Sequence, residues 1–411
     1  MRNILLVEEL SNALLVLFNF ILTSLVRPSI WGVTRIVFIP KDKLSRDIAT
    51  MRPISLLVVI SKLFERTLFP RLLRHVGHRL SFTQFAFQKG LSPLDALALL
   101  KRRIKESLSR PSRGRPFLFL DIMKAYDSVW WHGLLYKMIQ MGVPILYIKL
   151  IKIWLENRFV YAKSGSKVSS WKQIFKGLPQ GGVLCCILWA IYINDLPECL
   201  TEYCQCLLFA DDVQLTPILG GTDSITQITI AAAIACIWAN KWRLVWSNLK
   251  SMYICVNIAI PPSTLKLYEV PLIETTNYKY LGIHFSNDGK WLNHWETKLK
   301  KAKLLANLIL KFAVSSKFIP TAFIALLCLQ VLQPTLFYGF PIWTPPECLF
   351  TEADEILIKL FARSIASPWN AGVTVYLTEA GIMLTEIYWD YYALLYARRL
   401  RCSKTTGAKK G

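Results

Sequence analysis

The sequence predicts a mixed fold, of the α+β or the α/β class. Residues 117–121 and residues 207–212 are apolar runs that end in acidic residues. The short length of the first run, and Pro116 directly before it, favour a buried strand over a helix. Helix-like stretches alternate with these runs, which is the pattern of a sheet packed against helices.

Helices are expected after both strand-like runs and in the C-terminal part of the chain. The triplet Tyr126-Asp127-Ser128 supplies N-cap chemistry for a helix that runs through Trp130 to Gly142. Another helix is expected over residues 183–194. After residue 289 the pattern becomes mainly helical and basic, which places a boundary near Lys290.

The chain is strongly basic. Its 411 residues carry a formal net charge of +22, and the sequence pI is about 9.6. This balance favours polyanionic partners, because a basic surface releases counterions from phosphates. A membrane surface is a competing partner that charge alone does not separate from nucleic acid. Basic runs at residues 41–115 and 290–303 flank an acidic centre and favour nucleic acid, whereas a lone basic run is usually a solvated face.

Hydrophobic residues make up 53% of the chain, and two apolar stretches stand out. Residues 14–26 lack the charged start and the small-residue cleavage site of a secretory signal. Gln330, Gln333, Pro334 and Pro341 interrupt residues 319–343, so a buried helix followed by a turn is expected there rather than a membrane span. The ten cysteines lack zinc-ligand spacing, which indicates buried thiols in a reducing compartment. The protein is therefore expected to be intracellular, in the nucleus and/or the cytoplasm, and not secreted.

Three carboxylates are the candidates for chemistry. Asp121 closes the first apolar run, and Asp211 and Asp212 close the second. Neighbouring residues on a straight strand point to opposite faces, so a hairpin turn is needed to bring both acids of the pair to one site. Crowded carboxylates call for a cation, and hard oxygen ligands suit Mg²⁺ or Mn²⁺. An adjacent acidic pair is weak evidence by itself, since it is more often a structural turn.

These acids lie within an ordered series of short motifs. The series comprises Val33-Thr-Arg-Ile-Val-Phe-Ile-Pro-Lys41, Arg52-Pro-Ile-Ser-Leu-Leu57, Ser61-Lys-Leu-Phe-Glu-Arg66, Gln84-Phe-Ala-Phe-Gln-Lys-Gly90, Phe119-Leu-Asp-Ile-Met-Lys-Ala-Tyr-Asp-Ser-Val129, Gly177-Leu-Pro-Gln-Gly181, Tyr192-Ile-Asn-Asp-Leu196, Phe209-Ala-Asp-Asp212 and Tyr278-Lys-Tyr-Leu-Gly282. In order and spacing it resembles the reverse transcriptase domain of polyproteins from non-LTR (LINE-type, Jockey-like) retrotransposons. The resemblance runs from about residue 32 to residue 285 and extends more weakly to about residue 400.

The resemblance implies an α+β right-hand polymerase with fingers, palm and thumb, and with an antiparallel palm sheet packed on helices. It implies an N-terminal helical extension at residues 1–31, fingers and palm at 32–288, a basic, helical, thumb-like region at 289–400 and a basic tail at 401–411. The implied activity is RNA-directed DNA polymerisation, in which dNTPs are added to a primer 3′-hydroxyl with two Mg²⁺ or Mn²⁺ ions. The implied partners are an RNA template, a DNA primer and dNTPs. No membrane partner is expected, and the oligomeric state stays open.

The resemblance also assigns roles to single residues. Asp121, Asp211 and Asp212 match the palm carboxylates that hold the metal ions and carry catalysis. Lys250 matches a lysine that is a candidate general acid for pyrophosphate, although a surface lysine remains the alternative.

Four further residues match nucleotide-binding positions. Lys41 and Arg52 match finger positions near the triphosphate, where a cation would offset charge. Tyr126 matches the aromatic residue under the incoming sugar that can exclude a 2′-hydroxyl. Gln180 lies in the turn that contacts nucleotide and template, where glycines allow close approach of the backbone. The alternatives are solvated surface residues for the two cations, a core tyrosine and a plain turn.

Several positions depart from the family pattern. Gly182 stands where serine is usual, Cys185-Cys186 where Ser-Pro or a similar pair is usual, and Met51 where an aromatic residue is common. No endonuclease region is recognised ahead of Trp31, and no cysteine/histidine knuckle follows Phe285. The sequence-level expectation is therefore a truncated retrotransposon product that lacks an endonuclease. The alternative is a catalytically inactive, element-derived protein that binds nucleic acid.

Overall fold

The two apolar runs that end in acids lie in one sheet in the computed structural model, where the first forms β3 (Arg115–Asp121) and the second forms most of β7 (Cys204–Phe209) and the turn into β8 (Asp212–Pro217). β7 and β8 form a hairpin with each other. The sheet has the order β12-β9-β3-β8-β7, and both β3 and β7 pair antiparallel with β8. On the other side of β3 the sheet continues with β9 (Met252–Val256) and ends with β12 (Ile273–Glu274), and these two strands pair parallel. The apolar side chains of β3 are almost completely buried, as a strand covered on both faces requires.

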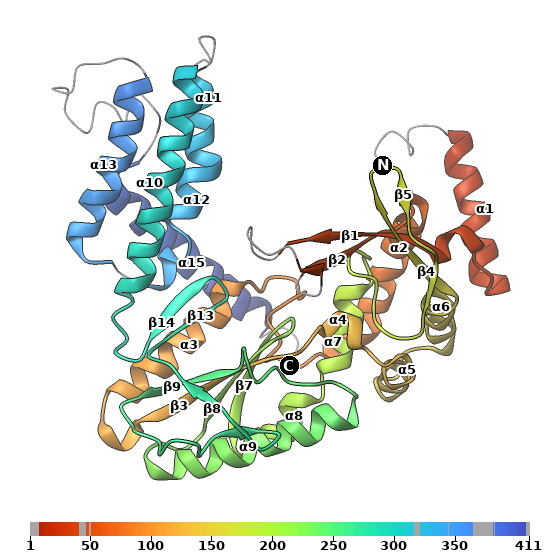
Figure 1. Ribbon diagram of the computed structural model, residues 1–411, viewed down its shortest axis with the longest axis horizontal. Helices are drawn as coiled ribbons and strands as arrows, with labels where there is room; N and C mark the ends of the chain where they lie inside the picture. Colours follow the sequence, from red (N-terminus) through yellow and green to blue (C-terminus); the bar gives the residue numbers. More distant parts are fainter. Residues whose placement is uncertain are drawn as a thin grey trace. The chain divides into compact units, whose positions relative to one another are not determined.

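Helices cover this sheet. α9 (Thr222–Lys241) packs against β3, β7 and β8, and three buried alanines, Ala231, Ala232 and Ala235, line its inner side. Figure 1 shows α8 (Leu196–Leu200) and α9 in green beside the strands, with α7 (Cys185–Ile193) next to them. Among the described residues, α9 alone is long and apolar enough to cross a membrane by length and composition. Packing of α9 against the sheet accounts for its apolar composition as well as a membrane span would.

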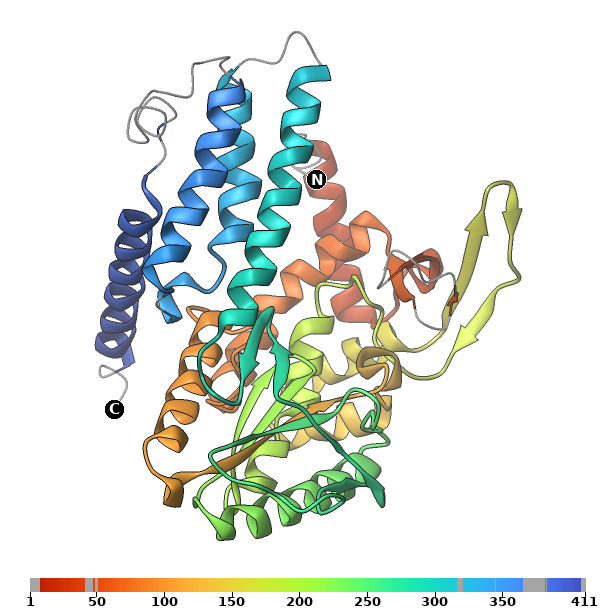
Figure 2. The same cartoon turned by 60° about the vertical axis from the view of Figure 1, so that its left-hand side comes forward.

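A second sheet lies nearer the N-terminus. It comprises β1 (Val33–Ile39), β2 (Arg52–Leu56), β4 (Arg158–Ser164), β5 (Lys167–Val168) and β6 (Lys172–Ile174). β1 pairs antiparallel with β2 and parallel with β4. The β4–β5 hairpin projects away from its neighbours (Figure 2). The helices of this part are α1 (Glu8–Ser24), α2 (Val59–Val76), α4 (Ala125–Ser128), α5 (Trp131–Gln140) and α6 (Ile145–Leu155).

The C-terminal part is mainly helical. Its helices are α10 (Leu292–Ser315), α11 (Thr321–Leu327), α12 (Gln333–Leu336), α13 (Glu347–Ser364) and α15 (Thr385–Gly407), and α3 (Pro93–Leu108) packs with them. The hairpin of β13 (Asn277–Tyr280) and β14 (Ile283–Ser286) precedes α10. Trp295, Phe340 and Trp343 form an aromatic core there. An ion pair of 2.6 Å between Arg399 and Asp95 links α15 to the start of α3.

Short elements complete the description. They are the 3₁₀ turns Ser29–Gly32, Gly77–Arg79, Pro111–Arg113 and Phe340–Ile342, the π-helical turn Cys328–Leu332, and the hairpin of β10 (Lys266–Leu267) and β11 (Val270–Pro271). The structure describes residues 8–40, 47–48, 51–315, 321–343, 345–364, 381 and 383–407.

The chain divides into two compact units, each discontinuous in sequence. The first comprises Met1–Leu91, Arg115–Tyr253 and Ile258–Glu274, and the second comprises Ser92–Gly114, Ile254–Asn257 and Thr275–Gly411. The α+β class and the antiparallel sheet packed on helices are confirmed. The domain boundaries at residues 31, 288 and 400 stay predictions.

One predicted helix differs in detail. Residues 126–142 form the short helix α4 and then α5, which begins at Trp131 rather than near Ser128. Val129 and Trp130 have ψ angles of 119° and 114°, so the backbone is extended between the two helices. This break lets the backbone of Val129 accept a hydrogen bond from the amide of Gly177 (2.8 Å). Residues 321–343 form several short helical pieces, in line with the expected helix plus turn.

Candidate active site

The three aspartates converge at one end of the β3–β8 pair. Asp121 and Asp212 lie directly opposite each other in the antiparallel register, and Asp212 also closes the hairpin opposite Phe209. Asp211 therefore sits in a two-residue turn together with Ala210. The turn resolves the problem that adjacent residues of a straight strand face opposite ways.

A buried glutamine supports this turn. The backbone of Ala210 has φ +55°, a left-handed conformation that costs a non-glycine residue about 1–2 kcal/mol. The side-chain oxygen of Gln84 accepts hydrogen bonds from the amides of Ala210 (3.3 Å) and Ala86 (3.0 Å). The backbone around Gln84 also pairs with Leu208 of β7, which fixes the glutamine beside the turn.

The electrostatics of the carboxylates reflect their crowding. Burial, and then the charges of Asp211 and Asp121, raise the pKa of Asp212 to about 7. Burial and the charge of Asp121 likewise raise the pKa of Asp211, while Arg52 and Lys250 lower it. The carboxylates thus favour a neighbouring cation, and their hard oxygen donors fit Mg²⁺ or Mn²⁺. Within the described part of the chain, no three His, Cys, Asp or Glu side chains are close enough together to share one metal ion as they stand.

A lysine lies beside the first carboxylate. Lys250 Nζ is 3.2 Å from Asp121 Oδ2, and its side chain is 57% exposed. The segment before β9 brings it there: the amide of Ser247 donates to the carbonyl of Asp121 (2.8 Å), and the amide of Asp121 donates to Ser251 Oγ (3.1 Å). The backbone pairing of this segment with the end of β3 therefore sets the position of Lys250.

Tyr126 and Gln180 occupy two connected segments next to the acids. The carbonyl of Tyr126 accepts a hydrogen bond from the amide of Leu178 (2.7 Å), so the Gly177–Gly181 motif lies along α4. Burial raises the pKa of the Tyr126 hydroxyl, and the charge of Asp211 adds to the shift. The ring of Tyr126 packs against buried Trp189 with centroids 5.4 Å apart. Gln180 Nε2 donates to Asp127 Oδ1 (3.0 Å).

Of the two cations predicted to lie near the triphosphate, the structure describes Arg52 only. Arg52 begins β2 opposite Ile39 and is exposed, and its charge lowers the pKa of Asp211. Lys41 lies outside the described residues.

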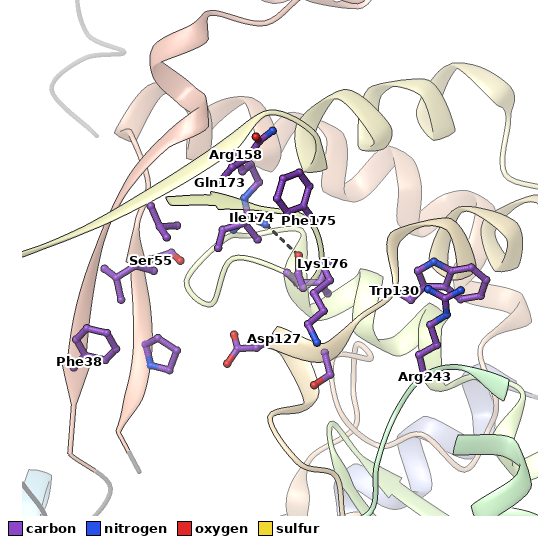
Figure 3. Close-up of a pocket in the computed structure, with 16 residues that line it drawn as sticks. Phe38, Ser55, Asp127, Trp130, Arg158, Gln173, Ile174, Phe175, Lys176 and Arg243 are labelled. Atoms are coloured by element: carbon purple, nitrogen blue, oxygen red, sulfur yellow. Dashed lines mark hydrogen bonds between the residues drawn. The ribbon is translucent and has the colours of Figure 1, made fainter. Parts of the chain in front are cut away.

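A pocket of about 740 Å³ adjoins the Gly177–Gly181 motif. Strands β1, β2, β4 and β6 supply one side of it, and Figure 3 shows Asp127 pointing across it towards Phe38. The guanidinium of Arg243 stacks on the ring of Trp130 at 4.0 Å. Phe175 and Lys176 also line the pocket.

The family model "Reverse transcriptase (RNA-dependent DNA polymerase)" matches residues 39–285, which is more than half of the chain and includes all three aspartates. The chain belongs to this family. The expected resemblance to Jockey-like non-LTR elements is confirmed. The division into fingers, palm and thumb, with the β3–β8 sheet as the palm, stays an expectation from this family.

Two relatives from Drosophila melanogaster illustrate the relationship. This reverse transcriptase chain is 30% identical over 345 residues to the probable RNA-directed DNA polymerase from transposon X-element, which covers 79% of the chain and 37% of that protein. It is 27% identical over 387 residues to the RNA-directed DNA polymerase from mobile element jockey, covering 89% and 41%. The matched parts thus span about two fifths of these relatives. The solved structure of apo telomerase from Candida tropicalis aligns with a TM-score of 0.48 at 12% identity, over 91% of this chain and 66% of that one.

The structure adds residues to the site that the sequence did not single out. Gln84 supports the Asp211 turn, and Ser251 binds the backbone of Asp121. Both lie in segments already quoted as family motifs or next to Lys250. Their residue types carry no recognisable chemistry, because their role consists of hydrogen bonds to the backbone of distant segments.

Proposed function

We propose that this chain is an RNA-directed DNA polymerase that adds dNTPs to a primer 3′-hydroxyl on an RNA template. The observation that carries the proposal is the meeting of Asp121, Asp211 and Asp212 at the end of β3 and β8, with pKa values raised for the adjacent pair. The match of these positions to the reverse transcriptase family supports it further.

The three aspartates would hold two divalent ions, which supply activation of the attacking hydroxyl and stabilisation of the leaving pyrophosphate. Lys250, which lies beside Asp121, would deliver a proton to the departing pyrophosphate. Arg52 would offset triphosphate charge, as would Lys41. Tyr126, held against Trp189, would present its ring to the sugar and disfavour a 2′-hydroxyl.

The pocket beside the Gly177–Gly181 motif supports a nucleic-acid partner. Sites for single strands combine cations that follow the phosphates with aromatic rings on which bases stack. Phe38, Trp130 and Phe175 offer such rings, and Lys176 and Arg243 offer such cations. Rings and cations in one pocket are the combination that an unpaired strand requires.

Primer extension tests the proposal. The protein is given a DNA primer annealed to an RNA template, dNTPs and Mg²⁺, and extension is compared for the wild type and for Asp211→Asn. The matched control is Asp223→Asn, because Asp223 is an exposed aspartate in the first turn of α9. We expect extension by the wild type and by the control, and a loss of about a thousandfold in Asp211→Asn.

Equal extension by the two aspartate variants would sink the proposal. No extension by any of the three proteins, with either Mg²⁺ or Mn²⁺, would also count against it. If such a protein still bound RNA in a salt-dependent manner, an inactive binding protein would be the better description.

A further inference from the structure

Two buried charges of opposite sign hold the ends of the segment that carries Gln180. Residues 177–184, here called the nucleotide turn, run from the family motif to the N-terminal cap of α7. The candidate site assigns no role to Glu65 of α2 or to Arg158 of β4, yet both side chains are directed at this turn. A charged side chain is almost never fully buried unless it has specific partners.

Glu65 binds the C-terminal end of the nucleotide turn. Its side chain is completely buried, and Oε2 accepts hydrogen bonds from the amides of Val183 (2.6 Å) and Leu184 (3.2 Å). Its other oxygen, Oε1, accepts from Trp154 Nε1 (3.2 Å). The carboxylate thus satisfies amides at the start of α7 that have no partner within the helix.

Arg158 binds the N-terminal end. Its side chain is 6% exposed, and Nη1 donates to the carbonyl of Gly177 (3.1 Å), the interaction drawn as a dashed line in Figure 3. Trp131 Nε1 donates to the same carbonyl (2.8 Å). Between the two ends, the carbonyl of Gln180 accepts from the amide of Ser55 (2.7 Å). The turn is therefore fastened at both ends and in the middle.

Two of the departures from the family pattern, Gly182 and Cys185, lie at this same place. A Cβ atom on Gly182 would come within 3.2 Å of Glu65 Oε2 and 3.0 Å of Cys185 Sγ. Cys185 in turn donates its thiol hydrogen to the carbonyl of Pro179 (2.8 Å). Gly182 and Cys185 therefore form one packed unit with Glu65, in which the absence of a side chain at residue 182 makes room for the carboxylate.

We propose that Glu65 and Arg158 are positioning residues that fasten the nucleotide turn and thereby hold Gln180 where it contacts the incoming nucleotide. The inference rests on the proposed polymerase function. Because the two residues act through the turn, weakening their contacts raises the KM for dNTPs and leaves the KM for the primed template nearly unchanged.

Glu65→Gln tests the inference through its hydrogen bonds. An amide side chain has one acceptor and one donor end, so it places an N–H group against either the Val183 and Leu184 amides or Trp154 Nε1. We expect the KM for dNTPs to rise about tenfold. Trp154→Phe removes the N–H donor that faces Oε1. In the double variant Glu65→Gln/Trp154→Phe, the amide oxygen can therefore face the amides of Val183 and Leu184 without placing its own N–H group against another donor. We expect that KM to return to within about threefold of Trp154→Phe alone.

The matched controls are Glu198→Gln and Trp171→Phe, which change the same residue types at exposed positions. Amide hydrogen exchange of residues 177–184 provides a readout that needs no catalysis. Faster exchange in Glu65→Gln, and slower exchange in the double variant than in Glu65→Gln, support the inference. A wild type that shows no extension defeats the polymerase proposal, whereas the exchange measurement still tests the turn.

Two results would overturn the inference. One is a folded Glu65→Gln protein whose KM for dNTPs and exchange rates match the wild type. The other is a double variant that is no better than Glu65→Gln, including the case in which both fail to fold. Purely structural damage would lower kcat and raise the KM for primed template together, and it would not be relieved by the second substitution.

Discussion

Gly177→Ala should destabilise the protein through a close approach that only glycine permits. Gly177 has φ +84°, and a Cβ atom there would lie 2.6 Å from the backbone oxygen of Asp127. The left-handed conformation costs alanine about 1–2 kcal/mol. Overlap with a backbone that cannot move aside adds about 1–3 kcal/mol. The free energy of unfolding should therefore fall by about 2–5 kcal/mol.

Gly165→Ala is the matched control. Gly165 lies at the tip of the β4–β5 hairpin with φ +59°, and a Cβ atom there would meet nothing within 4 Å. Gly165→Ala therefore carries only the conformational cost. The difference in unfolding free energy between the two variants then measures the overlap with Asp127. The measurement is urea unfolding followed by tryptophan fluorescence, with the KM for dNTPs as a second readout. Equal losses of stability in the two variants would refute the reasoning, and so would an unchanged KM in a Gly177→Ala protein that loses stability as expected.

Three further predictions concern the acidic centre. Lys250→Met should lower kcat about a hundredfold, because it removes the proton donor beside Asp121. Lys250→Arg keeps the charge that lowers the pKa of Asp212 but should not restore proton delivery. The matched control is Lys266→Met, at a lysine that pairs with Glu269, and equal pre-steady-state rates for the two methionine variants would contradict this. Tyr126→Val should raise ribonucleotide incorporation about tenfold or more relative to dNTPs, while Tyr126→Phe should stay near wild type because the ring supplies the bulk; unchanged discrimination in competition assays would argue against a gate. In the absence of metal, Asp212 has a folded-state pKa of about 7, above its ordinary 3.8, so the folded state binds more protons between these values and its stability falls as pH rises through that window. Mg²⁺ should then raise Tm more at pH 8 than at pH 5.5, and Asp212→Asn should reduce that difference; an equal Tm shift at both pH values would contradict the assignment.

Much of the candidate site was predictable because its chemistry resides in local motifs. Asp121 was expected at the end of a buried strand, and Asp211 and Asp212 were expected at a hairpin turn, and both features are present. Apolar runs and acidic ends are local properties, so they can be recognised without knowing the partners in space. The start of α5 was less predictable, because the extended backbone at Val129 depends on a hydrogen bond from Gly177, 48 residues further along the chain.

The sequence by itself determined which carboxylates to consider, the basic character of the chain and its family. Only the tertiary structure showed that Gln84, Glu65 and Arg158 contact segments of the site, because each binds backbone groups of a segment distant in sequence. Such roles leave no signature in residue type or spacing, since any buried side chain of suitable length could in principle meet those groups. Glu65 likewise requires a small residue at position 182, because a Cβ atom there would lie close to its carboxylate. Nothing in the sequence around either residue indicates this contact.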